Sequence, residues 1–322
     1  GGAYLCARTG AAWAQKGSIP LIAFDAADSD ALGSSVALSG DGATALVGAT
    51  NKSSNRGAAY VYVLSGSSWV FQHEILAWDG VAGDDFGRSV ALSHTGSVAL
   101  IGADNASLNG KLAAGVAYTF TRSGTTWSNG VKLSGKDTAA GDWFGAAASL
   151  SQDGSVALIG APHATVNLLA YEGAVYAFYG PAFAQQRKLI SNNPRTEGEL
   201  FGDALGTDAA AGLVLAGAPN MTWGYTHQGG VYEFTRLAGA WIQQDSYFND
   251  SGTQNEDLGY SQALSADGNT LLIGSVNKNV IFIYTRVRGA WRLQAEIPSN
   301  DPNSVDFGAA VALSADGNTA LV

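Results

Sequence analysis

The stretch that decides the fold is FGRSVALSHTGSVALIGA, which runs from Phe86 to Ala103. It holds two short apolar runs, 90–92 and 98–103, separated by the pair Thr95-Gly96. Short runs rich in branched residues and bounded by glycine are typical of β-strands. The stretch therefore predicts an antiparallel hairpin that opens with Phe-Gly and closes with Gly-Ala.

The same pattern recurs along the chain at intervals of 49 to 58 residues. Self-similarity at such a period indicates a repeat architecture, in which each repeat is one supersecondary unit. The six units open at Leu32-Gly33, Phe86-Gly87, Phe144-Gly145, Phe201-Gly202, Leu258-Gly259 and Phe307-Gly308.

Each unit predicts four strands. An Asp-Gly pair such as Asp41-Gly42 separates the first two runs in four of the units, and it supplies the positive φ angles that a tight hairpin needs. A third apolar run follows each loop, as at 58–63, and a fourth run carries a tryptophan such as Trp69. Units of four antiparallel strands predict an all-β fold, the β-propeller.

We expect one propeller over residues 1–322 with six four-stranded blades, or seven if the natural chain continues past Val322. The sixth unit stops after two strands, and the chain begins with two strand-like runs. Pairing of the N-terminal with the C-terminal strands would close the ring and hide its edges. The predicted blades are 32–78, 86–135, 144–190, 201–246, 258–296, and 307–322 completed by 1–24.

Composition narrows the classes of function. Hydrophobic residues make up 46% of the chain and charged residues 14%, and the net charge is −10. Nucleic-acid binding needs clustered Lys and Arg, which the sequence lacks, so we expect no nucleic-acid partner. No apolar stretch is long enough to span a bilayer, so we expect no membrane span in this segment.

The repeat resembles the FG-GAP family, whose best-known members are the integrin α-subunit propellers. The matching pieces are the Phe-Gly pairs and the Gly-Ala-Pro triplets at 160–162 and 217–219. The segment DGVAGDDFG at 79–87 is more similar to the bacterial and algal branch of this family. The resemblance implies an extracellular or cell-surface protein and a binding or adhesion role.

The calcium loops of integrins do not carry over. In that family, calcium lies in an Asp-x-Asp-x-Asp-Gly loop between strands one and two, and calcium needs six to eight oxygen ligands. Here the hairpin is Ser39-Gly40-Asp41-Gly42-Ala43, with a single Asp. We expect no integrin-type metal site and no cofactor.

Acidic residues gather just before the Phe-Gly pairs, and in the first three units they stand seven and two residues before it. One interpretation is a ring of calcium sites, or an acidic face for a basic partner. The other, which we favour, is that these aspartates cap local turns. The weak metal candidates are Asp79, Asp84, Asp137 and Asp142.

Aromatic residues outside the repeat positions are the candidate ligand contacts, because aromatic side chains supply much of the energy of binding. In a propeller, the loops that precede strand one and those between strands two and three share one face. Packing of these loops onto their own blades is the alternative. The predicted ligand-binding residues are Asp84, Asp85, Asp142, Trp143, Trp223, Tyr225 and Asp257.

Four Asn-x-Ser/Thr sequons are candidate N-glycosylation sites, a pattern used on exposed loops of secreted proteins. Chance alone produces a similar number in a chain of this composition. The candidate asparagines are Asn51, Asn105, Asn220 and Asn249.

Three functions remain open. The first is a non-catalytic extracellular module that binds protein or carbohydrate at the cell surface through loops on one face. The second is a structural subunit of an extracellular fibre, sheath or appendage, with neighbouring copies as partners. The third is a hydrolase with carboxylates on the acidic face; we expect no enzyme, since the sequence shows no nucleophile elbow, phosphate loop or dinucleotide motif.

Overall fold

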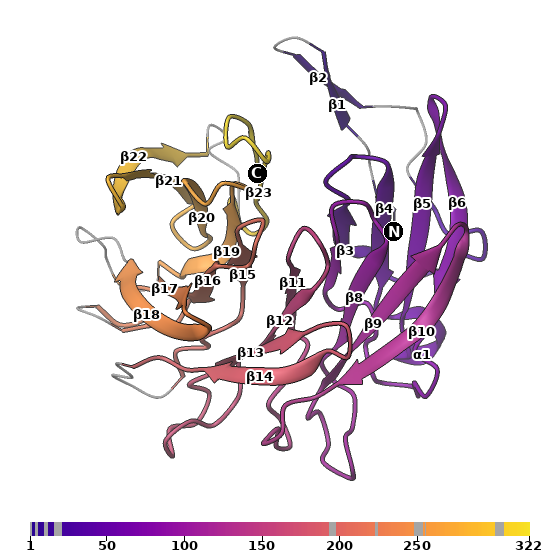
Figure 1. Cartoon of the computed structure of the whole chain (residues 1–322), viewed down its shortest axis with the longest axis horizontal. Helices are drawn as coiled ribbons and strands as arrows, with labels where there is room; N and C mark the ends of the chain where they lie inside the picture. The colour runs from indigo at the N-terminus through magenta and orange to yellow at the C-terminus, as the bar shows by residue number, and fades with distance from the viewer. Residues whose placement is uncertain are drawn as a thin grey trace.

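Four-stranded antiparallel sheets follow one another around a central axis (Figure 1). The structure is a computed structural model, and it describes residues 2–3, 6–9, 12–15, 21–192, 198–222, 225–247, 254, 256–299 and 306–322. Within these ranges there are five such sheets, and each pairs its strands in chain order. The chain is therefore an all-β propeller, as the repeat predicts.

The innermost strand of each blade is its first, and it lies beside the first strand of the next blade. The blades are β3 (Leu32–Leu38), β4 (Thr44–Ala49), β5 (Ala58–Ser65) and β6 (Ser68–Ile75); β7 (Val90–Leu92), β8 (Val98–Ala103), β9 (Val116–Ser123) and β10 (Thr126–Leu133); β11 (Ala147–Leu150), β12 (Val156–Ala161), β13 (Ala174–Tyr179) and β14 (Ala184–Leu189); β15 (Leu205–Thr207), β16 (Leu213–Ala218), β17 (Gly230–Leu237) and β18 (Ala240–Tyr247); and β19 (Leu258–Leu264), β20 (Thr270–Ser275), β21 (Val280–Val287) and β22 (Ala290–Pro298).

The prediction of six or seven blades in a ring closed by the termini is wrong. Among the described residues, β1 (Cys6–Thr9) pairs only with β2 (Ala12–Gln15), and β23 (Ala312–Leu313) pairs only with β24 (Ala320–Leu321). The expected blade from 307–322 and 1–24 is thus two separate two-stranded sheets. A repeat specifies the pairing of strands that are joined by a short turn. Closure of the ring instead pairs strands from the two ends of the chain, which has a large entropic cost and is encoded by no local pattern.

The Phe or Leu that opens the second to fifth units is a core residue between neighbouring blades, as its apolar character predicts. Phe86 is fully buried and packs with Leu46 and Val61 of the first blade as well as with Tyr118 of its own. Phe144, Phe201 and Leu258 are likewise fully buried. Burial of these side chains stabilises the contact between blades.

The glycine of each Gly-Ala pair lets one blade approach the next. A Cβ on Gly102 would lie 2.0 Å from the carbonyl oxygen of Gly145 in the following blade, so no larger residue fits there. Beside this contact, the hydroxyl of Ser89 donates a hydrogen bond of 2.8 Å to the same carbonyl. The repeat thus encodes the spacing between blades.

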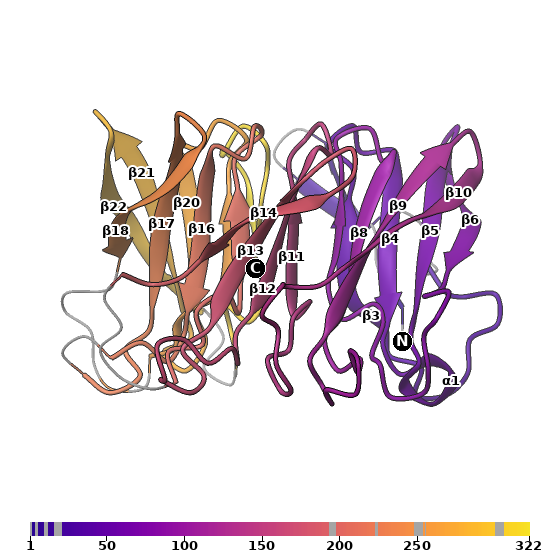
Figure 2. The same cartoon turned by 60° about the horizontal axis from the view of Figure 1, so that its bottom comes forward.

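The long loops lie on one face of the propeller and the tight hairpin turns on the other (Figure 2). We call the first the loop face; it consists of the strand 2–3 loops and the inter-blade loops that join one blade to the next. Backbone hydrogen bonds connect the two kinds of loop, as from the amide of Asp85 to the carbonyl of Asn55 in the short helical segment α1 (Lys52–Asn55), 2.8 Å, and from Trp143 to Ala113, 3.3 Å. The loop face is therefore one connected surface.

Candidate functional site

Two of the predicted aspartates cap turns. The backbone amide of Val81 donates to Asp84 Oδ2 at 2.8 Å, and that of Ala139 donates to Asp142 Oδ2 at 2.7 Å. Both carboxyl groups are buried. An Asp that accepts from a backbone amide three residues earlier stabilises its own loop. Asp84 and Asp142 therefore position the inter-blade loops.

The other two weak metal candidates each have two partners within the protein. The hydroxyl of Tyr118 donates to Asp79 at 2.8 Å, and Lys132 Nζ lies 2.6 Å from its second oxygen. Burial alone would raise the pKa of Asp79, but the hydrogen bonds from Lys132 and Tyr118 outweigh it and the pKa is lowered. Asp137 repeats this arrangement in the next blade.

No group of three or more His, Cys, Asp and Glu side chains within the described residues could hold a metal ion. The absence of a calcium requirement remains a prediction.

The residue directly before each Phe-Gly or Leu-Gly pair has a left-handed backbone. Asp85 has φ 58°, Trp143 has φ 57° and Asp257 has φ 51°. This conformation costs a non-glycine residue roughly 1–2 kcal/mol. Strain of this kind persists where the surrounding structure imposes it, and it is common at functional sites. The same position in the remaining units also has positive φ: Ala31, Leu200 and Asp306.

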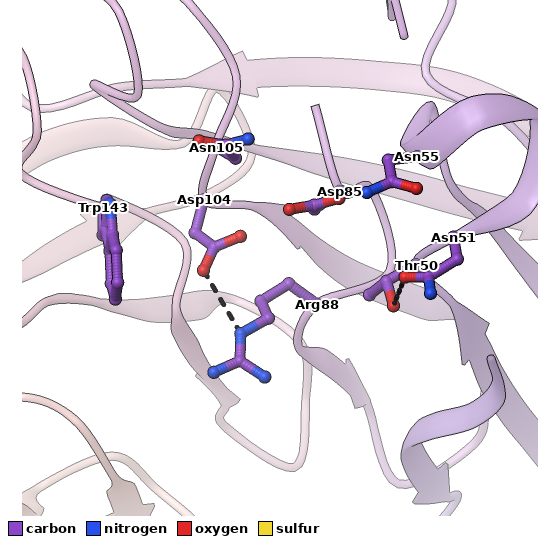
Figure 3. A pocket seen from close by; sticks show the side chains of 8 residues that line it. All are labelled: Thr50, Asn51, Asn55, Asp85, Arg88, Asp104, Asn105 and Trp143. Atoms are coloured by element: carbon purple, nitrogen blue, oxygen red, sulfur yellow. Dashed lines mark hydrogen bonds and ion pairs between the residues drawn. The ribbon is translucent and has the colours of Figure 1, made fainter. Parts of the chain in front are cut away.

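Two of these left-handed residues, Asp85 and Trp143, line one pocket of about 370 Å³ on the loop face (Figure 3). Strand 2–3 loops supply most of the other lining side chains, and Arg88 comes from the segment between β6 and β7. The pocket thus draws on the first three blades. Its lining is Thr50, Asn51, Asn55, Asp85, Arg88, Asp104, Asn105 and Trp143.

Asp104 is the most deeply placed charge of the pocket, with 7% of its surface exposed. Its Oδ2 lies 3.2 Å from Nε of Arg88, while its Oδ1 is buried without a hydrogen-bond partner. Oδ1 of Asp85 is also buried and unpartnered. Burial raises the pKa of Asp104 to about 6 despite the opposing charge of Arg88, and burial also raises the pKa of Asp85. Buried polar atoms without partners are rare in folded proteins and call for an explanation.

Trp143 gives the pocket an aromatic wall. Its ring stacks on His163 at a centroid distance of 3.6 Å, and His163 in turn meets the edge of Tyr171 at 4.9 Å. Burial lowers the pKa of His163, which favours the uncharged imidazole. Trp143 remains 38% exposed. The indole is therefore fixed from one side and accessible from the other.

The remaining predicted residues lie elsewhere. Asp257 accepts a hydrogen bond of 2.6 Å from Asn277, and Tyr225 is 48% exposed; neither lines the pocket. Trp223 and the sequon residue Asn249 lie outside the described residues. Of the other sequon residues, Asn51 and Asn105 are exposed and line the pocket, whereas Asn220 is half-buried.

Sequence reasoning missed Arg88, Asp104, Asn55 and Thr50 as pocket residues, and it proposed Asn51 and Asn105 only as sugar attachment sites. Arg88 stands one residue after a Phe-Gly pair, and Asp104 directly follows a Gly-Ala pair. Asp104 could have been noticed in the sequence, because it is the one charged residue at this position of the repeat. The equivalent residues are Thr50, Pro162, Pro219 and Val276.

The fold and the loop-face pocket define a β-propeller with a polar pocket among its loops. The sequence profile of the FG-GAP repeat matches residues 13–62, 69–120 and 127–178. The chain therefore carries three FG-GAP repeats and folds as a β-propeller, a combination that suggests a binding or structural module. The match does not distinguish the integrin-like branch from the others.

Solved structures add a likeness of fold. A functionally unknown protein from Desulfotomaculum acetoxidans DSM 771 is similar at a TM-score of 0.58 and 9% identity, over 88% of this chain and 76% of that chain. Hydrazine synthase of Kuenenia stuttgartiensis is similar at a TM-score of 0.48 and 12% identity, over 92% of this chain and 94% of that chain. At 9% identity the likeness to the Desulfotomaculum protein concerns the fold alone. No curated protein sequence matches the chain.

Among the described residues, no helix has the length and apolar character needed to cross a membrane.

Proposed function

We propose that the chain is a non-catalytic extracellular binding module that recognises a partner at a cell surface through the pocket on its loop face. The observation that supports this most is Asp104 Oδ1, a buried carboxyl oxygen that borders an open pocket and has no partner. A buried acceptor left unpaired costs about 1–3 kcal/mol, and a bound donor would remove that cost.

The arrangement around Asp104 supports the same role. Asp85 and Trp143 both hold left-handed backbones, and both present their side chains to this pocket. Two adjacent units thus share a strained position at a single place on the surface. Loops held by a rigid scaffold are where binding residues concentrate.

The non-catalytic part of the proposal rests on the placement of the carboxyl groups with raised pKa. Burial and the nearby charge of Glu199 raise the pKa of Glu172 to about 7, but Glu172 is fully buried and cannot touch a substrate. Oδ2 of Asp104 is bonded to Arg88, which opposes the rise in pKa caused by burial, although the pKa still reaches about 6; the proposal gives Asp104 the role of a hydrogen-bond acceptor.

The extracellular part rests on the repeat, because FG-GAP repeats are typical of extracellular proteins.

The test is competition for intact cells. Fluorescently labelled chain is applied to cells and measured by flow cytometry, with unlabelled variants as competitors. We expect unlabelled Leu237→Ala, a change at the 56% exposed last residue of β17 beside a hairpin turn of the opposite face, to compete as well as the unchanged protein. Unlabelled Trp143→Ala should compete at least tenfold less well. Absence of any saturable staining, or equal competition by both variants, would overturn the proposal.

A further inference from the structure

The pocket offers unused hydrogen-bond acceptors. Oδ1 of Asp85 and Oδ1 of Asp104 are both buried and without partners. A ligand that fills the pocket therefore needs at least two donor groups. This requirement excludes an apolar ligand, which would leave both oxygens unpaired.

The pocket also offers unused donors. Arg88 uses Nε on Asp104, and its terminal nitrogens make no hydrogen bond within the described part of the chain. Its side chain is 51% exposed. Exposed Asn51 accepts from Thr50 through its Oδ1 at 3.2 Å, and its amide nitrogen has no partner among the described residues. A ligand that only donates would leave these groups unmatched.

The charges of the lining restrict the class of ligand further. The two carboxylates and one guanidinium give the lining a net charge of about −1, and the whole chain carries −10. An anionic ligand meets net repulsion from Asp85 and Asp104, whereas a cationic ligand is attracted by them but leaves the terminal nitrogens of Arg88 without acceptors. A neutral ligand that both donates and accepts has neither penalty.

A sugar has these properties. Each hydroxyl group both donates and accepts, so neighbouring hydroxyls can bond carboxylate oxygens and guanidinium nitrogens side by side. The exposed side of Trp143 offers a flat apolar surface for the C–H groups of the ring. The volume of about 370 Å³ lies at the lower end of the range of about 300–1,000 Å³ for small-ligand pockets. It suits the terminal unit of a glycan.

We propose that the pocket lined by Asp85, Arg88, Asp104 and Trp143 binds a neutral sugar at the end of a glycan chain. This inference rests on the proposed function, and it names the ligand class of the same site.

The experiment uses the full chain on an array that carries neutral glycans, sialylated glycans and glycans ending in uronic acids. Titrations with free glucose, mannose, galactose, N-acetylglucosamine, glucuronic acid and lysine methyl ester follow, measured by calorimetry. We expect retention on a subset of neutral glycans, and at least a tenfold preference for one neutral monosaccharide over both charged probes.

Matched variants locate the site. Asp85→Ala should weaken binding of the preferred sugar at least tenfold, whereas Asp257→Ala, at the equivalent left-handed position outside the pocket, should change it less than twofold. Trp143→Phe keeps a ring and should lose three- to tenfold, while Trp78→Phe, at a tryptophan of similar exposure outside the pocket, should lose nothing. Thermal melting of each variant verifies that it folds.

Preference for a charged probe, equal loss in Asp85→Ala and Asp257→Ala, or no retention on any glycan would overturn the inference. If the chain ignores all glycans yet still stains cells through Trp143, the partner is a protein and the proposed function stands. If cell staining also fails, both proposals fall.

Discussion

Nε of Arg88 lies 3.2 Å from Oδ2 of Asp104, while the other oxygen of that carboxyl group is buried without a partner. Arg88 thus supplies the charge that lets Asp104 remain ionised at the bottom of the pocket.

Replacing Arg88 by alanine tests that relationship. At pH 8 the variant leaves a buried carboxylate without its counter-charge, and we expect a loss of about 1 kcal/mol in unfolding free energy, discounted because the arginine is half exposed. At pH 5, below the pKa of about 6, Asp104 is protonated and the loss should nearly vanish. Urea denaturation at both pH values measures this, with Arg292→Ala as an exposed control. Equal losses at pH 5 and pH 8 would contradict it.

A second prediction concerns the pH dependence of stability. Glu172 is fully buried, both its carboxyl oxygens lack partners, and burial together with the charge of Glu199 raises its pKa to about 7 from 4.5. The folded state then binds more protons than the unfolded state between these values, so the unfolding free energy falls as pH rises through this window. Glu172→Gln should be more stable than the unchanged protein by about 1–3 kcal/mol at pH 8 and nearly equal to it at pH 4.5.

Chemical denaturation across pH 4–8 measures that difference. Asp28→Asn, at an exposed aspartate, serves as the control and should leave the pH profile unchanged. A Glu172→Gln profile parallel to that of the unchanged protein would show that Glu172 does not titrate in this window.

A third prediction compares two hairpins of the loop face. In both, two residues join a pair of mutual backbone hydrogen bonds: Asn109-Gly110 between 108 and 111, and Asn167-Leu168 between 166 and 169. Gly110 and Leu168 both have positive φ, 79° and 71°, and Leu168 is 94% exposed. Leu168→Gly should therefore stabilise the protein and Gly110→Leu should destabilise it, each by about 1 kcal/mol. Thermal melting checks the two signs; a Leu168→Gly variant that melts lower would refute the argument from backbone strain.

A fourth prediction concerns the sequons. Asn51 and Asn105 line the pocket, and the Asn105 amide donates a hydrogen bond of 2.6 Å to the carbonyl of Gly83. A glycan on either residue would fill the mouth of the pocket. In native material we expect both to be unmodified, as measured by peptide mass spectrometry. An attached sugar at either position in most molecules would be incompatible with a ligand site there.

The features of the fold that could be predicted from the sequence are those encoded by the repeat and by local turns. The Phe-Gly pairs predicted the first strands and the contact between blades, since the buried rings of Phe86, Phe144 and Phe201 have the same role in three successive units. The preference for turn-capping aspartates agrees with Asp84 and Asp142, because a cap needs only neighbours in the chain.

The sequence could not predict what depends on long-range arrangement. Two-stranded sheets at both termini replaced the expected sixth blade, because pairing between the chain ends has no local signal. The pocket was not predicted for a related reason, because Asp104 and Trp143 come from different repeats. In addition, Asp85 and Trp143 have left-handed backbones although neither is a glycine, so the sequence gives no sign of this conformation.

The most direct test of the loop-face pocket is to block its mouth with a bulky polymer. In a Cys6→Ser background, Asn105→Cys places a single thiol at the exposed rim of the pocket, and Ala240→Cys places one at the exposed start of β18, beside a hairpin turn of the opposite face. Each is joined to a maleimide-linked polyethylene glycol chain, and binding to intact cells is measured before and after. We predict that the polymer at position 105 abolishes saturable binding and that the polymer at 240 leaves it unchanged. Undiminished binding with position 105 fully modified would contradict the assignment of the pocket as the binding site.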